Sequence, residues 1–214
     1  MSCCSRRRAV FVALSAGLAL ALLTLWVLLG SIEGIDRRIL SSIDVLRSPG
    51  ADTVFRLGTR LGSVYLLGPV ALVATLVLAV YGFRRDAWML ALGFYGSTWP
   101  ACMLKILIQR SRPEIIEGLQ YSMPASSAFP SGHTTNAAAM ALCLASILGR
   151  HKSGLRPAVA FVFSSAVGGV ALSRIYLHVH WPSDVVAGLL VALMWTKAVY
   201  AAVYAHQQDR ESDP

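Results

Sequence analysis

The feature of this sequence that most restricts its fold is a series of six long apolar segments. They run approximately over residues 9–29, 64–83, 87–104, 133–149, 157–173 and 184–204. A helix of about 20 apolar residues crosses the roughly 30 Å hydrocarbon core of a bilayer. The sixth segment alone carries formal charge, and its Lys197 lies near one end, where the side chain can reach the membrane surface. The sequence therefore predicts an all-α, polytopic membrane protein with six transmembrane helices.

The composition agrees with this prediction and excludes an ordinary soluble domain. Of the 214 residues, 56% are hydrophobic and only 14% are charged. The first apolar segment follows Arg6, Arg7 and Arg8, and it is longer than the apolar region of a cleaved signal peptide. We interpret it as a retained signal anchor. Residues 1–214 are therefore predicted to form a single membrane domain, whose oligomeric state the sequence leaves open.

Residues 31–63, between the first two apolar segments, have a different pattern. Five apolar residues recur at helical spacing over 32–46, and Ser48-Pro49-Gly50 interrupts the pattern before a weaker one resumes. We expect a pair of amphipathic helices that lie at the membrane interface.

The distribution of basic residues predicts the orientation. Six spans place both termini on one side, and a bare count of Lys and Arg barely separates the two sides. Two short loops, FRRD at 83–86 and GRHKSGLR at 149–156, are densely basic and would share the side of the termini. Cytoplasmic loops are enriched in Lys and Arg, so we expect cytoplasmic termini.

Three polar clusters then fall on the opposite side. The first is KILIQRSRP, where Lys105 and Arg112 are seven residues apart. On a continuous helix, both cations would lie on one face and point to a single anion. Taken alone, the cluster is more often an ordinary basic boundary of a transmembrane segment.

The second cluster is Pro-Ser-Gly-His at 130–133, directly before the fourth apolar segment. Ser131 is a natural N-cap, and the first N–H groups of the helix would point outward as a site for an anion such as phosphate. Gly132 would permit close approach of the ligand. A capped helix with an interfacial His133 is about equally consistent with this stretch alone.

The third cluster is SRIYLHVHWPSD at 173–184. His180 and Asp184 are four residues apart across a predicted helix start at Pro182, so that the carboxylate can orient the imidazole. In isolation such a pair is more often structural than catalytic. Together, the clusters supply cations, backbone donors and two histidines, the groups that phosphoryl transfer without a metal requires.

These clusters resemble the three signature motifs of the type 2 phosphatidic acid phosphatase family, in the right order and without a substitution. The resemblance spans 105–184 and implies roles for eight residues. His180 would be the nucleophile, Asp184 would orient it, and His133 would be the general acid and later the base. The phosphate would be held by Lys105, Arg112, Ser131, Gly132 and Arg174.

The resemblance implies a lipid phosphatase of a bacterial inner membrane, which forms a phosphohistidine at the periplasmic or outer face without a metal or other cofactor. Undecaprenyl diphosphate, phosphatidylglycerophosphate, phosphatidic acid and lipid A phosphates remain open as substrates. The expected partners are the lipid substrate and the bilayer, with no nucleic acid. A lipid-to-lipid phosphotransferase is the nearest alternative, and a transporter or non-catalytic lipid-binding protein is the alternative from another class.

Overall fold

The computed structural model describes residues 3–113, 126–151, 154 and 156–204, and every regular element in this part of the chain is a helix. Each of the six predicted apolar segments largely coincides with a helix, and residues 31–63 form shorter ones. The elements are α1 (Cys3–Leu28), α2 (Glu33–Asp44), α3 (Pro49–Gly58), the 3-10 helix η1 (Thr59–Gly62), α4 (Val64–Val80), α5 (Arg84–Ile108), α6 (Gly132–His151), α7 (Arg156–Tyr176) and α8 (Pro182–Val203).

Four stretches of helix are long and apolar enough to cross a membrane. Within the described residues they are Ser5–Leu28, Pro49–Val80, Arg156–Tyr176 and Pro182–Val203. Helices α5 and α6 have sufficient length but a more polar composition, because α5 begins with Arg84, Arg85 and Asp86 and α6 begins with a His-Thr-Thr-Asn run. Composition therefore supports a multi-pass membrane protein and leaves the predicted count of six spans unconfirmed.

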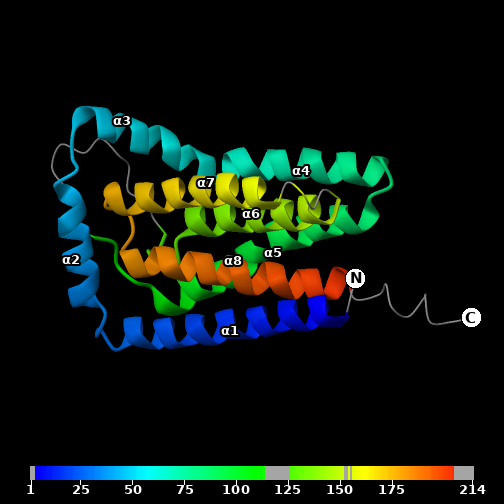
Figure 1. Ribbon diagram of the computed structural model, residues 1–214. Helices are drawn as coiled ribbons and strands as arrows, with labels where there is room; N and C mark the ends of the chain where they lie inside the picture. The colour runs from blue at the N-terminus through cyan, green and yellow to red at the C-terminus, as the bar shows by residue number, and fades with distance from the viewer. Residues whose placement is uncertain (1–2, 114–125, 152–153, 155, 205–214) are drawn as a thin grey trace, which may run out of the picture.

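The long helices form a bundle, with α2 lying across one of its ends (Figure 1). Helix α8 packs against α1, α5 and α6, and α6 also contacts α5 and α7. One buried apolar cluster joins α4, α5, α6 and α8 through residues such as Met89, Phe94 and Cys143. A second cluster joins α1, α5 and α8. The start of α1 and the end of α8 lie at the end of the bundle opposite α2.

Helix α2 forms where the amphipathic pattern predicted a helix, but only some of its apolar residues pack against the bundle. Ile32, Asp36 and Leu40 are buried against the bundle, whereas Ile35 and Ile39 are exposed. These exposed isoleucines give α2 an outer apolar surface. The buried Asp36 is the unexpected member of its inner surface.

Helix α3 begins as the Ser48-Pro49-Gly50 break predicted. The hydroxyl of Ser48 accepts a hydrogen bond from the N–H of Ala51, and Pro49 occupies the first turn, where its missing N–H costs nothing. Side chains then tie α2 and α3 to the end of α7. Arg47 donates to the Tyr176 carbonyl at 2.7 Å, and the Tyr176 hydroxyl donates to Asp52 at 2.6 Å.

Gly188 of α8 allows the chain before α6 to approach closely. A Cβ at this position would lie 2.7 Å from the carbonyl oxygen of Ser131 and 3.2 Å from side-chain atoms of Thr134 and Thr135. The oxygen belongs to the backbone and cannot move aside as a flexible side chain would. The N–H of Ser131 also donates to the Asp184 carbonyl at 2.9 Å. The start of α6 is therefore held directly against α8.

We predict that Gly188→Ala destabilises the protein by about 1–3 kcal/mol, the usual cost of overpacking a buried contact. Gly168→Ala is the matched control, because a Cβ at Gly168 of α7 meets no atom within 4 Å. This control should be neutral or slightly stabilising, since alanine is favoured over glycine within a helix. Thermal unfolding of the purified variants in detergent measures both effects. Equal melting temperatures for the two variants would contradict the close approach.

Candidate active site

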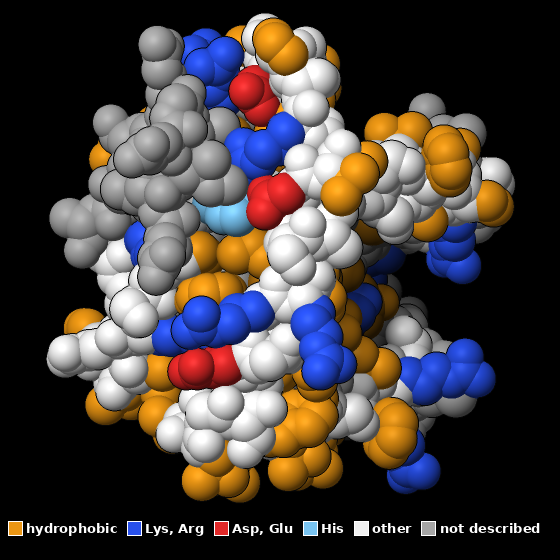
Figure 2. Space-filling view, turned by 90° about the vertical axis from the view of Figure 1, so that its left-hand side faces the viewer, with side chains coloured by type: hydrophobic (Ala, Val, Ile, Leu, Met, Phe, Trp, Pro, Cys, Tyr) orange, Lys and Arg blue, Asp and Glu red, His pale blue; other side chains and the backbone are white. Residues whose placement is uncertain are grey.

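The predicted site residues lie at the end of the bundle that carries α2. The ends of α5 and α7, the starts of α6 and α8, and the segments that follow α5 and α7 meet there. Figure 2 looks onto this end and shows acidic and basic side chains gathered on it, with a histidine side chain visible among them. Residues far apart in the sequence are thereby brought to one location.

Lys105 and Arg112 contact the same loop, although no continuous helix joins them. Helix α5 ends at Ile108, because Gln109 adopts a left-handed conformation with φ 48°. Arg112 therefore lies in the irregular segment after the helix. Lys105 donates to the Ser127 carbonyl at 2.6 Å, and Arg112 donates to the Ser126 carbonyl at 2.8 Å. The one-face arrangement that a continuous helix would give does not form, although both side chains reach the same loop.

The Pro-Ser-Gly-His stretch forms the turn into α6. The Phe129–Pro130 peptide bond is cis, and α6 begins at Gly132, directly after Ser131. Ser131 is fully buried, and its carbonyl accepts the first hydrogen bond of the helix from the N–H of Thr135 at 2.9 Å. A Cβ at Gly132 would meet no atom within 4 Å. The first turn of α6 therefore has open space beside its glycine.

Arg174 is a fully buried cation at the end of α7. Its guanidinium donates to the hydroxyl of Thr59 in η1 at 2.7 Å. Thr59 is itself buried and was not singled out from the sequence. Coulombic interactions link His133 of α6 to Arg174, His180 and Arg112. The two histidines and these two arginines thus share one electrostatic environment.

His180 is buried between a guanidinium and a carboxylate. Its Nε2 lies 3.2 Å from the Arg112 guanidinium, and its Nδ1 lies 3.5 Å from Asp184 Oδ2. The second distance is longer than a normal hydrogen bond. Asp184 thus faces one ring nitrogen, as the spacing of four residues allowed, and leaves Nε2 on the side of Arg112.

Burial lowers the pKa of His180 well below its usual value, and the positive charges of Arg174, Arg112 and Lys105 act in the same direction. The ring is therefore neutral at neutral pH. A neutral imidazole has a lone pair available for attack. The surrounding cations, which disfavour a proton on the ring, would favour an anion beside it.

Two residues that the sequence analysis did not select hold Asp184 in place. Arg110 donates to Asp184 Oδ1 at 2.8 Å and to Asp36 Oδ2 at 2.7 Å. Asp36 also accepts from the N–H of Ser183 at 2.9 Å. A charged chain thus runs from Asp36 in α2 through Arg110 to Asp184 beside His180.

The sequence positions of Arg110 and Asp36 gave only ambiguous indications that they belong to the site. Arg110 lies inside the first polar cluster, between its two selected cations. Asp36 lies on a helix whose surface acidic residues would usually face water. Only the fold shows that Asp36 is 1% exposed and directed at Arg110. His178 donates from Nε2 to Asp44 Oδ1 at 2.8 Å and so helps to hold α2.

The family comparison matches the part of the chain that contains this site. The family model described as "PAP2 superfamily" matches residues 86–208. Phosphatidylglycerophosphatase B of Bacillus subtilis is 27% identical over 167 residues, which cover 77% of this chain and 81% of that protein. Decaprenylphosphoryl-5-phosphoribose phosphatase of Mycolicibacterium smegmatis is 34% identical over 141 residues, which cover 65% of this chain and 72% of the relative.

Solved structures resemble the whole arrangement. A crystal structure of a transmembrane PAP2 type phosphatidylglycerolphosphate phosphatase from Bacillus subtilis aligns with a TM-score of 0.82 at 25% identity, covering 92% of this chain and 98% of that one. The structure of Aquifex aeolicus LpxE aligns with a TM-score of 0.62, also at 25% identity, and covers 76% and 93%.

We predict that His180 makes stability depend on pH. The pKa of His180 is below 6.5 in the folded protein and near 6.5 in the unfolded chain, so the unfolded chain binds the proton first as pH falls below that value. Stability should therefore decrease from pH 7 towards pH 5, with a contribution from this ring of up to about 1.4 kcal/mol per pH unit. His180→Asn cannot titrate and should show a shallower loss of melting temperature. Parallel curves for the two proteins would contradict the buried, neutral ring.

We also predict that Asp36→Asn destabilises the protein by about 1.5–3 kcal/mol, the value of a hydrogen bond to a charged group. Glu33→Gln, on the same helix, is the matched control, because Glu33 forms only an exposed ion pair with Arg37 at 4.0 Å. Thermal unfolding of the two variants provides the comparison. A loss with Glu33→Gln as large as that with Asp36→Asn would mean that general charge on α2, and not the Arg110 contact, stabilises this end.

Proposed function

The chain belongs to the PAP2 superfamily, and we propose that it hydrolyses a lipid phosphate or diphosphate through a phosphohistidine on His180. The observation that carries this proposal is the environment of the buried imidazole. Its Nε2 faces the Arg112 guanidinium at 3.2 Å, and its Nδ1 faces Asp184. A phosphoryl group beside Nε2 would therefore meet a nucleophile and a fixed cation together.

In the first step, the lone pair of His180 Nε2 attacks phosphorus while the bond from phosphorus to the leaving oxygen breaks. Arg112, Arg174 and Lys105 stabilise the charge on the phosphoryl oxygens, and the N–H groups in the first turn of α6 add further donors. An anionic phosphate bound in the site offsets the surrounding cations, so that His133 can take up a second ring proton and give it to the leaving oxygen. Asp184 stabilises the positive charge that forms on the His180 ring, with Arg110 and Asp36 holding the carboxylate in position.

In the second step, water attacks the phosphohistidine. His133, now without its proton, removes a proton from this water while the bond from phosphorus to Nε2 breaks. Inorganic phosphate leaves, and both histidines return to their starting states. The groups that bind the first transition state serve the second as well, because the same phosphoryl oxygens carry the charge in both steps.

We further infer that α5 and α6 also cross the membrane, which restores the six spans. Their polar residues are concentrated at the two ends, while the middle of α5 contributes buried Leu90 and Phe94 to the core. The short basic FRRD and GRHKSGLR loops support cytoplasmic termini. The active site would then lie at the outer face of a bacterial inner membrane, next to the headgroup layer.

The relatives support a lipid substrate of the class predicted from the sequence. Two of these relatives are named for phosphatidylglycerophosphate and for a decaprenyl-linked phosphoribose phosphate. Both substrates join a phosphate to a tail that can remain in the bilayer. We therefore propose that the substrate diffuses laterally to the site, with its phosphate entering among the cations and its tail staying among lipids.

The roles of the two histidines predict different responses to the leaving group. His180→Ala should abolish phosphoenzyme formation with every substrate, because the nucleophile is lost. His133→Ala should slow phosphoenzyme formation from a lipid monophosphate by about 10²–10⁴-fold, the usual contribution of a general acid. An activated aryl phosphate releases a stable phenolate and should be slowed much less. Rapid quench of a single turnover isolates this first step from the later action of His133 on water.

The same experiment includes excess chelator, in which activity should persist, and vanadate, which should inhibit as an analogue of the five-coordinate phosphoryl group. Equal losses with the two substrates in His133→Ala would mean that His133 binds phosphate and does not deliver a proton. A phosphoenzyme that still forms in His180→Ala would assign the nucleophile elsewhere. Chromatography of the lipid products separates hydrolysis, which releases inorganic phosphate, from transfer to a second lipid.

A further inference from the structure

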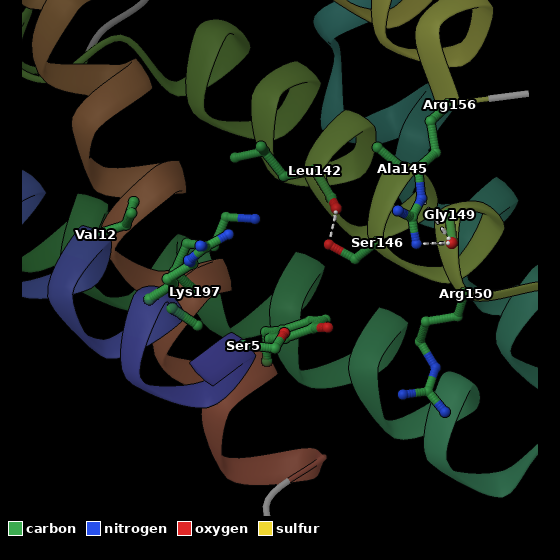
Figure 3. Close-up of a pocket in the computed structure, with 12 residues that line it drawn as sticks. Ser5, Val12, Leu142, Ala145, Ser146, Gly149, Arg150, Arg156 and Lys197 are labelled. Atoms are coloured by element: carbon green, nitrogen blue, oxygen red, sulfur yellow. Dashed lines mark hydrogen bonds between the residues drawn. The ribbon is translucent and has the colours of Figure 1, made fainter. Parts of the chain in front are cut away.

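A second polar cavity lies at the opposite end of the bundle from the candidate active site (Figure 3). Its volume is about 340 Å³, and it lies between the start of α1, the end of α6, the start of α7 and the last turns of α8. Four of its lining residues are basic, and none of the described lining residues is acidic. The basic residues are Arg8, Arg150, Arg156 and Lys197.

Two of these four cations are engaged by neighbouring groups. Arg150 lies over the ring of Tyr204 at 3.9 Å and 3.8 Å from Asp86, and Figure 3 shows its side chain turned away from Lys197. Arg156 donates to the carbonyl of Gly149 at 2.6 Å. The only carboxylate recorded near this cavity among the described residues, Asp86, already accepts from the Tyr204 hydroxyl and contacts His151 at 2.7 Å.

Arg8 and Lys197 therefore remain without a counter-charge among the described residues. Lys197 belongs to α8, which is apolar enough to cross a membrane, and its side chain is partly buried between α1 and α8. Its nearest recorded interaction is with the ring of Tyr200, at 5.7 Å. A partly buried cation in a transmembrane helix is costly unless an anion compensates it. An anion bound in the cavity would offset this cost, since no described carboxylate lies beside Lys197.

We propose that this cavity binds a phosphate group between Arg8 and Lys197. Ser5, in the first turn of α1, also lines the cavity, and the start of a helix carries the positive end of the helix dipole. The cavity lies at the end of the bundle where α1 begins and α8 ends. A lipid headgroup in the leaflet at that end presents a phosphate at this depth, and inorganic phosphate presents the same chemistry from solution.

This site is separate from the proposed catalytic site. Asp184 and Lys197 lie 13 residues apart on α8, which places them about 20 Å apart along the helix at 1.5 Å per residue. The two sites would therefore contact opposite leaflets of the bilayer. A phosphate group bound to both Arg8 and Lys197 would link the start of α1 to the last turns of α8.

The test compares two double variants that remove the same charge. Arg8→Gln with Lys197→Gln alters the cavity, whereas Arg6→Gln with Arg7→Gln alters neighbouring cations that do not line it. Native mass spectrometry of the full-length protein in detergent measures retention of dioleoylphosphatidylglycerol, with and without millimolar inorganic phosphate. A parallel arm measures binding of radiolabelled inorganic phosphate. The active site is unchanged in every protein, so any binding there is common to all and cancels.

We expect the cavity variant to bind the lipid about 30-fold more weakly, taking about a five-fold gain for each cation near an anionic group. The Arg6 and Arg7 variant should lose much less. Insensitivity to inorganic phosphate would identify the ligand as a lipid headgroup, whereas loss of inorganic phosphate binding confined to the cavity variant would identify it as phosphate from solution. Arg8→Lys with Lys197→Arg keeps both charges and should retain binding.

Equal losses in the two charge-removing variants, or no loss in either, would overturn the proposal. A loss of binding in the charge-conserving variant as large as that in the cavity variant would also overturn it, because binding would then follow general damage and not charge. Failure of this test leaves the phosphohistidine mechanism unaffected, since phosphoenzyme formation is measured at the other end of the molecule.

Discussion

The side chain and backbone of Asp184 connect parts of the molecule that lie far apart in the sequence. Its carboxylate accepts hydrogen bonds from Arg110 and from the N–H of Trp181, and it faces His180. Its carbonyl accepts from the N–H of Ser131, so that the turn into α6 is fixed against the start of α8. Arg110 extends the connection to Asp36 of α2. One buried carboxylate thus connects the predicted nucleophile, the turn before α6 and helix α2.

This arrangement explains why a site rich in charge can exist at the end of an apolar bundle. Burying an isolated charged or polar side chain costs free energy. Four such side chains are buried here: Asp36, Asp184, Arg174 and His180. Pairing offsets part of that cost, since Arg110 lies between two carboxylates. The remaining excess of positive charge around His180 is compensated when an anion binds, which is the property that a phosphate site needs. Helix α2 therefore supports this cluster of charged residues through Asp36.

Family membership was predicted from three short motifs and is confirmed, because those motifs are local and their chemistry requires particular residue types. The all-helical fold was predicted for a similar reason, since apolar runs of about 20 residues have few stable alternatives in a bilayer. The roles of His180, His133, Asp184 and the five phosphate-binding residues remain predictions, as does the orientation. The sequence left open whether a continuous helix joins Lys105 to Arg112, and the left-handed Gln109 ends α5 before Arg112.

The sequence by itself determined the elements and the chemical groups: the positions of the apolar helices, the break at Ser48-Pro49-Gly50, and the clusters that hold the cations and histidines. These depend on residue type and short spacing, which can be read along the chain. Only the tertiary structure decided that Asp36 and Arg110 support Asp184, that Thr59 contacts Arg174, that Gly188 admits the Ser131 turn, and that Arg8 and Lys197 share a cavity. Each of these contacts joins residues more than 50 positions apart, and helical periodicity carries no information about which faces meet at such separations.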